Sequence, residues 1–470
     1  MRKTKIVCTI GPASNNEEIL TQMCLAGMNV ARLNFSHGTH DDHKKNIELI
    51  KKVRDKLGLP IAILLDTKGP EYRIGIFENN KIFLNDGDTF IFTTDDIIGN
   101  EERVSVSYKG LTKEMVAGDR ILLNNGLVIF EVTNIEGNNI ICKVVTGGEV
   151  SDRKSMSFPN KVLKQVYLSE QDKKDLRFGI ENGVDFIACS FVSCKQDLVD
   201  VNEFLKKCGR CDIELIAKIE NQAGIDNIEE ICSECSGIMI GRGDMGVEIA
   251  YEKLPAIQKH LITKCRLLGK RVITATEMLE SMIKNPRPTR AEISDVANAV
   301  YDGSSAVMLS GETAAGKYPI EAVRAMAKIA EETEQNIHLE KRFAQSSFKI
   351  KNSVDAISHA TCGMAIDLNA SAIVVCSHSG TTVRMVSRFR PPVDIIGITT
   401  NPGACRRLSL SWGVTPVLVE TYPSTEVLFY VAKKTAVQLF NLKKDDKIII
   451  TGGAANGRSG NTDIIKIENV

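Results

Sequence analysis

The sequence predicts an α/β fold in three parts: a (β/α)8 TIM barrel, a small β-barrel lid domain inserted into it, and a C-terminal open α/β domain. Short runs rich in β-branched residues alternate with helical patterns. Eight of these runs are apolar on both faces, which is typical of parallel strands covered by helices. One long segment instead alternates apolar and polar residues between Asn-Gly and Asp-Gly turns. A doubly wound open sheet is the alternative to the barrel on this pattern alone.

Helical punctuation separates the eight expected barrel strands. The first helical pattern ends at Gly27, and Thr289 with Glu292 has the spacing of a capping box. We expect the barrel strands at residues 5–10, 29–36, 61–66, 184–191, 213–220, 237–244, 271–276 and 305–312. The alternating segment follows the third of these strands, where a lid over the barrel mouth is a natural role for an insertion.

We therefore expect four segments along the chain. Residues 1–69 and 168–340 form the barrel, residues 70–167 form the inserted lid, and residues 341–470 form the C-terminal domain. In that last segment, helical stretches alternate with expected strands at residues 370–380, 393–401, 414–420 and 447–453.

Composition excludes several classes of protein. A chain of 470 residues is too long for one core, and about three domains are expected. Lys plus Arg and Asp plus Glu both total 59, so the zero net charge favours neither nucleic acid nor a membrane surface as partner. We interpret the 13 cysteines as reduced, buried thiols of an intracellular protein. No run approaches the ~18 apolar residues of a membrane helix, and the start of the chain has the pattern of a strand. We expect a cytoplasmic protein.

Polar residues follow the apolar part of six expected barrel strands. Active sites of such barrels lie where the strands end, so these side chains are expected to converge. A strand-end ion pair or cap explains any one of them, but six together indicate an active site. They are Arg32, Asn34, Ser36, Asp66, Thr67, Lys218, Glu220, Asp244, Thr276, Glu277, Ser310 and Glu312.

The charges among these residues suggest phosphoryl transfer. Glu220 and Asp244 are hard oxygen ligands of the kind that Mg²⁺ or Mn²⁺ prefers, and none of the seven histidines has zinc-site spacing. Lys218 and Arg32 add fixed positive charge beside the ion, as a transferring phosphoryl group requires. The backbone of "GRGDMG" suits a carboxylate.

A second cluster is rich in oxygen atoms. Asn34, Ser36, Asp66 and Thr67 follow two neighbouring strands and suggest a site for a monovalent cation.

Seven motifs together resemble the pyruvate kinase family: "TKIVCTIGP", "GMNVARLNFSHG", "LLDTKGPEYR", "AKIENQAG", "GRGDMGVE", "NPRPTRAEISDVANAV" and "MLSGETAAGKYP". The similarity runs in order from residue 1 to about residue 340 and continues more weakly to the end of the chain. It implies the glycolytic transfer of a phosphoryl group from phosphoenolpyruvate to ADP, which gives pyruvate and ATP. It also implies the barrel, lid and C-terminal domain.

The resemblance implies a role for each matching residue. Arg32 and Lys218 would contact the phosphoryl group. Glu220 and Asp244 would hold the divalent ion. The backbone of Gly243 and Asp244, with Thr276, would receive the substrate carboxylate, and Thr276 would belong to the proton route. The implied K⁺ ligands are Asn34, Ser36, Asp66 and Thr67, and the implied nucleotide contacts are Arg73, Lys154, His37 and Asn34. Glu71 is the residue type that accompanies K⁺ dependence.

Three features depart from the family pattern. Glu277 stands where Gln is usual, Tyr72 replaces an aliphatic residue, and the lid exit at residues 154–170 lacks the usual glycines and a later proline. Two alternatives therefore stay open. One is a Mg²⁺-dependent lyase or aldolase acting on pyruvate-like acids, and the other is a non-catalytic, metabolite-binding homologue.

The C-terminal domain contains a hydroxyl-rich turn from an expected strand into a helix. Its residues are Ser377, Ser379, Gly380, Thr381 and Thr382. Such a turn can cradle a phosphate, and ordinary capping by Ser379 or Thr381 explains it equally well. The resemblance favours an effector site for a phosphorylated ligand, completed by residues 457–462, and a homotetramer.

Overall fold

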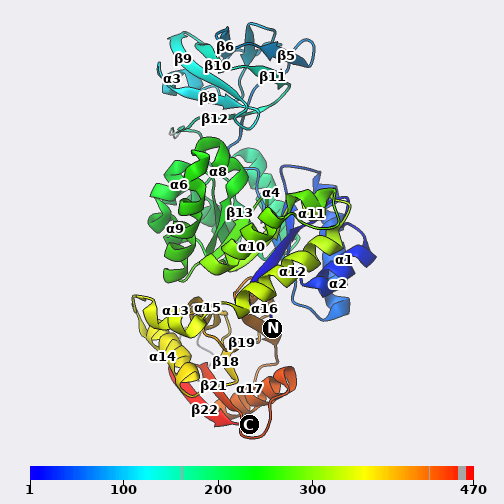
Figure 1. Cartoon of the computed structure of the whole chain (residues 1–470), viewed down its shortest axis with the longest axis vertical. Helices are drawn as coiled ribbons and strands as arrows, with labels where there is room; N and C mark the ends of the chain where they lie inside the picture. Colours follow the sequence, from blue (N-terminus) through cyan, green and yellow to red (C-terminus); the bar gives the residue numbers. More distant parts are fainter. Residues whose placement is uncertain (160, 162, 423, 454–461) are drawn as a thin grey trace.

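The computed structural model contains the three predicted parts, stacked along one axis with the barrel in the middle (Figure 1). It describes residues 1–159, 161, 163–422, 424–453 and 462–470. The inserted β domain lies at one end of the barrel and the C-terminal domain at the other (Figure 1). The predicted fold class is thereby confirmed.

Eight parallel strands close the barrel in the order β1-β17-β16-β15-β14-β13-β3-β2. They are β1 (Lys5–Thr9), β2 (Val30–Asn34), β3 (Ala62–Asp66), β13 (Phe186–Cys189), β14 (Glu214–Ile219), β15 (Gly237–Gly241), β16 (Arg271–Ala275) and β17 (Ala306–Leu309). Glu220 and Thr276 lie just beyond their strands, and Asp244 lies in the first turn of the helix Arg242–Glu248 that follows β15.

Helices cover the outside of the barrel, and their ends agree with the sequence signals. Asn16 caps α1 and Gly27 ends it with φ 119°, a backbone conformation that glycine adopts without strain. Thr289 and Glu292 form the expected capping box of α10. The helices are α1 (Glu17–Ala26), α2 (His40–Leu57), α4 (Glu170–Glu181), α5 (Lys195–Lys207), α6 (Gln222–Asp226), α7 (Ile228–Glu234), α8 (Arg242–Glu248), α9 (Leu254–Leu267), α10 (Arg290–Asp302), α11 (Gly311–Ala314) and α12 (Pro319–Gln335).

The inserted domain is a seven-stranded sheet, β4-β12-β8-β9-β10-β6-β7, with a separate pair, β11-β5. A bridge between Ile74 and Val106 joins the two ends of the larger sheet, so it curls back on itself. Its elements are β4 (Tyr72–Arg73), β5 (Lys81–Leu84), β6 (Thr89–Thr93), β7 (Arg103–Ser105), α3 (Leu111–Glu114), β8 (Arg120–Leu123), β9 (Val128–Glu136), β10 (Asn139–Thr146), β11 (Gly148–Ser151) and β12 (Ser155–Ser157).

The C-terminal domain is a five-stranded sheet in the order β20-β19-β18-β21-β22. The last strand, β22, pairs antiparallel with β21, and the sequence patterns did not predict it because its apolar and polar residues are half exposed. The elements are α13 (Leu339–Gln345), α14 (Ser353–Asp367), β18 (Ala372–Cys376), α15 (Thr381–Arg388), β19 (Asp394–Thr399), α16 (Pro402–Leu408), β20 (Val414–Leu418), α17 (Thr425–Phe440), β21 (Lys447–Gly452) and β22 (Ile464–Asn469).

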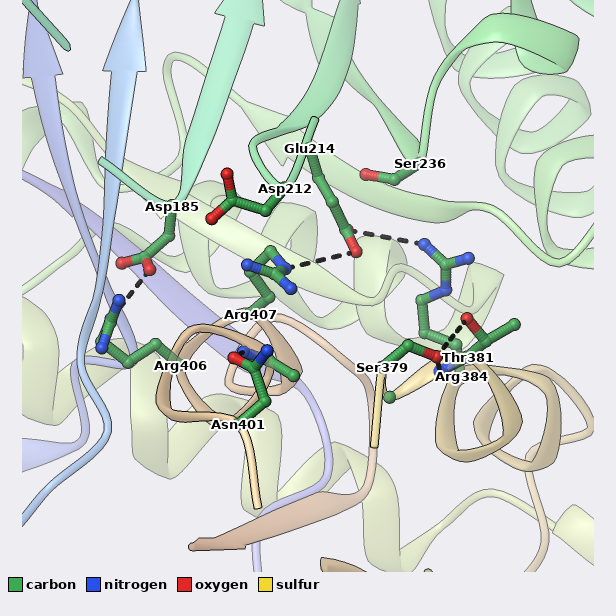
Figure 2. Close-up of polar contacts among 12 residues, drawn as sticks. Asp185, Asp212, Glu214, Ser236, Ser379, Thr381, Arg384, Asn401, Arg406 and Arg407 are labelled. Carbon is green, nitrogen blue, oxygen red and sulfur yellow. Dashed lines mark hydrogen bonds and ion pairs between the residues drawn. The ribbon is translucent and has the colours of Figure 1, made fainter. Parts of the chain in front are cut away.

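The C-terminal domain is joined to the amino-terminal end of the barrel by apolar packing and ion pairs. Leu410 is fully buried and belongs to the apolar cluster inside the barrel. Glu214, at the start of β14, contacts Arg271 of the barrel and also Arg384 and Arg407 of the C-terminal domain, while Asp185 pairs with Arg406 at 2.8 Å (Figure 2).

The charge of Glu214 holds this interface together. Burial alone would raise the pKa of Glu214, but the guanidinium groups of Arg271, Arg384 and Arg407 outweigh it and lower that pKa to about 2. A pKa below its ordinary value means that the carboxylate stabilises the fold at neutral pH. This stabilisation is lost as the pH falls from about 4.5 towards 2.

Replacing Glu214 with Gln should therefore destabilise the protein by about 2–3 kcal/mol at pH 7, because three guanidinium groups lose their shared carboxylate. The value lies below that of a fully buried pair because 21% of the Glu214 side chain is exposed. Thermal unfolding followed by circular dichroism measures the difference, which should narrow when the pH is lowered to 4. Glu203→Gln, on the exposed face of α5, should leave the midpoint unchanged. Equal thermal midpoints for the wild type and Glu214→Gln would contradict the stabilising role assigned to the Glu214 carboxylate.

Candidate active site at the carboxyl ends of the barrel strands

A buried carboxylate joins two cations at the carboxyl ends of β2, β3 and β14. Asp66 is fully buried, and its Oδ2 lies 2.6 Å from Nε of Arg32 while its Oδ1 lies 3.1 Å from Nζ of Lys218. Arg32 also donates a hydrogen bond to Oγ1 of Thr9, at 2.9 Å. The two cations are held side by side but cannot neutralise their charges fully on one carboxylate.

Ser190 completes this group, and sequence reasoning missed it. The residue follows β13, is 1% exposed, and its Oγ accepts a hydrogen bond from Lys218 Nζ at 2.7 Å. Its hydroxyl also lies within hydrogen-bonding distance of Thr67 O (2.6 Å) and Asp66 Oδ1 (3.2 Å). The only signal in the sequence was its position directly after an apolar strand, because serine is common in loops.

Glu220 faces the same ammonium group from the end of β14. Its Oε1 lies 3.1 Å from Lys218 Nζ, and its Oε2 accepts a hydrogen bond from the backbone N–H of Phe191 at 2.8 Å. A Cβ at Gly241 would lie 2.7 Å from Cγ and Oε1 of Glu220. Glycine at this position therefore gives the carboxylate the room that it occupies.

The electrostatics of the site are unbalanced in a way that a cation would relieve. Burial alone would lower the pKa of Lys218, but Asp66 and Glu220 outweigh it and raise that pKa above its ordinary value, so the ammonium is charged. Burial, and then repulsion from Asp244, raises the pKa of Glu220 to about 7 even though Lys218 opposes it. Burial with Asp244 and Glu220 likewise raises the pKa of Glu248 to about 8. One ammonium shared between Asp66 and Glu220 does not compensate this acidic group.

A strained loop after β16 lies against the start of α8. Thr276 and Glu277 have φ of 66° and 53°, the left-handed region that side chains rarely adopt. Arg242 holds this backbone by donating to the carbonyl oxygens of Thr276 (2.6 Å) and Glu277 (3.1 Å), and it pairs with Asp295 at 2.7 Å. Oγ1 of Thr276 accepts a hydrogen bond from the N–H of Gly243 at 2.8 Å.

These contacts bring Thr276, Gly243 and Asp244 to the same end of the barrel as Lys218 and Glu220. Arg242 positions the loop after β16, and sequence reasoning missed this role because it depends on a contact with a distant loop. Backbone strain of this kind persists only where surrounding contacts enforce it, and it is concentrated at functional sites.

The predicted oxygen-rich cluster is compact. Asn34 and Asp66 are partners in the pairing of β2 with β3, and Thr67 follows directly. The side-chain oxygen of Asn34 accepts a hydrogen bond from the N–H of Ser36 at 3.2 Å. Oγ1 of Thr67 accepts one from the N–H of Ser190, also at 3.2 Å. The four residues thus lie beside the Arg32–Asp66 pair.

Comparison with known proteins identifies the family. The model described as "Pyruvate kinase, barrel domain" matches residues 1–323, and the one described as "Pyruvate kinase, alpha/beta domain" matches residues 355–468. A pyruvate kinase from Clostridium acetobutylicum is 45% identical over 100% of this chain and 99% of its own. One from Bacillus licheniformis is 46% identical over 99% of this chain and 80% of its own.

The chain belongs to the pyruvate kinase family. A crystal structure of a pyruvate kinase from Cryptosporidium parvum superposes with a TM-score of 0.95 at 38% identity, covering 100% of this chain and 96% of that one. The predicted family is confirmed, and with it the activity: the enzyme transfers a phosphoryl group from phosphoenolpyruvate to ADP, giving pyruvate and ATP. Family membership also implies a requirement for metal ions.

The expected nucleotide contacts of the pyruvate kinase family fall into two places. Arg73 and Lys154 are neighbours in the inserted domain because β4 pairs with β12. Arg73 forms an ion pair with Glu71 and donates a hydrogen bond to the backbone oxygen of Arg153. His37 and Asn34 lie together in the turn after β2. Among the described residues, no contact joins the pair on the inserted domain to the pair on the barrel.

The departures from the family pattern leave the site residues in place. The side chain of Glu277 is exposed, so its added charge faces solvent. Tyr72 packs edge-on against Tyr108 and Phe158 at ring distances of 5.7 and 5.3 Å, where the inserted domain leaves the barrel. At the lid exit, residues 160 and 162 lie outside the described part of the chain.

The hydroxyl-rich turn precedes α15. Gly380, with φ 80°, is the residue before the helix and makes no side-chain cap. Oγ of Ser377 accepts a hydrogen bond from the N–H of Gly380, and the hydroxyls of Ser379 and Thr381 are 3.1 Å apart. Thr382 is buried and bonded to Thr462 at 2.6 Å. Residues 457–461 of the expected second loop lie outside the described part of the chain.

The cysteines are free thiols, and ten of them are buried. Two CxxC spacings, Cys208–Cys211 and Cys232–Cys235, are present in the sequence. Within the described residues, no three or more His, Cys, Asp and Glu side chains gather closely enough to hold a metal ion. No helix in that part of the chain is both long and apolar enough to cross a membrane.

Proposed function

We propose that the enzyme performs its phosphoryl transfer with Lys218, Arg32 and Thr276 as catalytic residues, with Mg²⁺ (or Mn²⁺) at Glu220 and Asp244, and with K⁺ at the neighbouring oxygen cluster. One observation carries this proposal. Lys218 is a charged ammonium, with 12% of its side chain exposed, held between Asp66, Glu220 and Ser190 at the mouth of the barrel. Such a group, largely shielded from water, stabilises the negative charge of a transferring phosphoryl group.

Glu220 and Asp244 have the chemistry that a divalent ion requires. Both are hard oxygen donors, and burial with repulsion from Asp244 raises the pKa of Glu220 to about 7. Two carboxylates without further protein ligands suit Mg²⁺, which keeps coordination positions for water and substrate oxygens. When bound, the ion supplies positive charge for the substrate's carboxylate and enolate oxygens.

Arg32 and Lys218 stabilise the phosphoryl group from two strands. Asp66 separates the two cations and fixes their direction, so neither has to reorganise when the phosphoryl group arrives. The N–H groups of Gly243 and Asp244 receive the substrate carboxylate. Because Gly243 now donates to Thr276, substrate binding exchanges that contact for one with the carboxylate. The released hydroxyl of Thr276 is then free to join the route by which a proton reaches the enolate carbon.

K⁺ would bind to oxygen atoms of Asn34, Ser36, Asp66 and Thr67, and ADP would contact His37 and Asn34 on the barrel. Arg73 and Lys154 would reach the nucleotide from the inserted domain, whose lid role excludes water from the transferring group. The proposed division of the chain at residues 69/70, 167/168 and 340/341 assigns these roles to separate domains.

Replacing Lys218 with Met should lower kcat by about 10²–10³-fold, on the order of 3 kcal/mol or more of transition-state stabilisation. The measurement couples pyruvate formation to NADH oxidation in the presence of phosphoenolpyruvate, ADP, Mg²⁺ and K⁺. Lys5→Met is the matched control, because Lys5 is a buried barrel lysine at the opposite end that donates to Val414 O. Lys5→Met should keep near-normal turnover. Near-normal turnover of Lys218→Met would leave Lys218 as a structural ion pair only.

Replacing K⁺ by tetramethylammonium should reduce activity at least tenfold, because that ion is too large for oxygen ligands at this spacing. In the absence of K⁺, Glu71→Lys should restore part of the lost activity by placing an ammonium near the oxygen-rich cluster. The gain should be incomplete because Glu71 lies between Lys68 and Arg73, so the variant introduces repulsion. Glu78→Lys, an equal charge change on an exposed lid residue, should restore nothing. Rates that do not depend on the cation would refute the K⁺ assignment.

The turn of Ser377, Ser379, Gly380, Thr381 and Thr382 would bind the phosphate of an effector. The cluster of hydroxyls at the start of α15 supports this proposal, and a bound phosphate would replace Ser379 Oγ as the acceptor for the N–H of Thr381, a contact of 3.4 Å in the structure. Isothermal titration of fructose 1,6-bisphosphate and ribose 5-phosphate should give heats with the wild type that Thr382→Glu abolishes, because the carboxylate repels the phosphate. Equal heats for both proteins would argue against the turn as the site.

Family resemblance alone supports the assembly and location. We propose a cytoplasmic homotetramer, and sedimentation velocity of the full chain measures its mass.

A further inference from the structure

A second cluster of charged side chains lies at the amino-terminal end of the barrel. It is formed by α9 and β16 of the barrel and by the carboxyl-terminal half of α15. It surrounds a small cavity of about 20 Å³. The cavity adjoins the contact of Arg384 with Glu214 that is drawn in Figure 2. Its cationic lining residues are Arg266, Lys270, Arg271, Arg384, Arg388 and Arg390.

Anionic groups do not balance these six cations. In the part of the chain that the structure describes, Glu214 contacts Arg271 and Arg384, and Asp355 contacts Arg388 at 3.1 Å. Lys270 donates only to a backbone carbonyl, that of Cys235. Two carboxylates are thus shared among six cations, while Glu214 also serves Arg407.

Arg266 and Arg390 have no carboxylate partner among the described residues, although both are buried. They are 9% and 4% exposed. Arg390 donates to Gly303 O and Ser305 Oγ, both at 3.0 Å, and stacks on Trp412, whereas Arg266 stacks on Phe348 at 5.9 Å. Burial, with Arg342 beside it, lowers the pKa of Arg266 to about 10, so this guanidinium stays charged at neutral pH.

Several nitrogen atoms around the cavity lack an acceptor within the described part of the chain. Nε of Arg390, Nε of Arg388, and Nε with one terminal nitrogen of Arg266 are buried and have no hydrogen-bond partner there. Buried donors are almost always satisfied in folded proteins, and a guanidinium cannot neutralise itself by losing a proton. Unpaired buried cations with free donors require negative charge from outside the chain.

We propose that this interdomain cavity is a binding site for a small inorganic anion, held by Arg266 and Arg390 with help from Arg388. The size of the cavity decides the class of ligand. Pockets for small organic molecules are roughly 300–1,000 Å³, so this one is too small for a phosphorylated sugar. A halide has the required charge and size, because about 20 Å³ is the room of one small ion, whereas a tetrahedral oxoanion such as sulfate would require the surrounding side chains to move.

This site is distinct from the proposed effector turn. The turn lies at the start of α15, at Ser379 and Thr381, whereas Arg388 and Arg390 lie at and beyond its end. Because Arg266 comes from the barrel and Arg390 from the C-terminal domain, a bound anion joins the two domains through shared electrostatic attraction.

The direct test is crystallographic. Crystals of the full chain are soaked in sodium bromide or in sodium selenate, which stand for the halide and the oxoanion, and anomalous difference maps are calculated. We expect a peak within hydrogen-bonding distance of Arg266 and Arg390 in at least one soak, and which soak gives it identifies the type of anion. The absence of a peak in the cavity from both soaks would overturn the proposal.

A solution test uses Arg266→Met, which keeps the packing on Phe348 and removes the unpaired charge. Thermal midpoints are measured against sodium bromide and sodium sulfate, with ionic strength held constant by sodium gluconate. The wild-type midpoint should rise and saturate. Arg266→Met should need at least tenfold more anion for the same rise, and without added anion its midpoint should equal or exceed that of the wild type.

Two controls separate this site from other anion sites. Arg177→Met removes an exposed arginine that stacks on Phe204 at 5.4 Å, and Thr382→Glu blocks the effector turn. Both variants should keep the saturating rise. If Arg266→Met keeps it unchanged, or if Thr382→Glu abolishes it, the stabilising anion binds elsewhere and the proposal is wrong.

Discussion

A single buried carboxylate organises the catalytic end of this molecule. Asp66 has two oxygen atoms, and each contacts a different cation: Arg32 on one side and Lys218 on the other. Burial alone would raise its pKa, but Lys218 and Arg32 outweigh burial and lower the pKa, so the carboxylate stays ionised. Because Asp66 is fully buried, it cannot move away from either partner without leaving a charge unpaired in the interior. The spacing of the two cations is therefore set by the barrel itself.

The strand β14 links this site to the opposite end of the barrel. It begins at Glu214, which contacts Arg271 of the barrel and two arginines of the C-terminal domain, and it carries Lys218 near its end, with Glu220 just beyond it. Only three residues separate Glu214 from Lys218 along the strand. The C-terminal domain also contributes Leu410 to the interior of the barrel, so interface and barrel are packed as one unit. The same strand therefore contacts the C-terminal domain at one end and carries Lys218 at the other.

Charge is distributed unequally between the two ends. The catalytic end has an excess of carboxylates, Glu220, Asp244 and Glu248, and burial together with their mutual repulsion raises the pKa values of Glu220 and Glu248. The interdomain end has an excess of guanidinium groups with free donors among the described residues. A net charge of zero for the chain conceals both. The two excesses have the same physical consequence, since charge of opposite sign from outside the chain would stabilise each end.

The sequence by itself determined the elements of the fold and most of the site. Periodicity and turn signals predicted the eight barrel strands, the inserted β domain and the parallel C-terminal sheet, since local patterns of apolar residues reflect burial directly. Because the ends of barrel strands converge, the order of the strands was enough to predict one common site for Arg32, Asp66, Lys218, Glu220, Asp244 and Thr276.

Only the tertiary structure decided how these residues are paired. Ser190 is one of many serines in loops, and its contact with Lys218 depends on two strands meeting in register. Arg242 holds a strained loop 34 positions away, and Arg266 and Arg390 meet across a domain interface. The strand β22 gave no clear pattern because it is half exposed at a sheet edge. Local sequence encodes which face of an element is buried, whereas ion pairs and cavities depend on distances between segments that only the folded chain brings together.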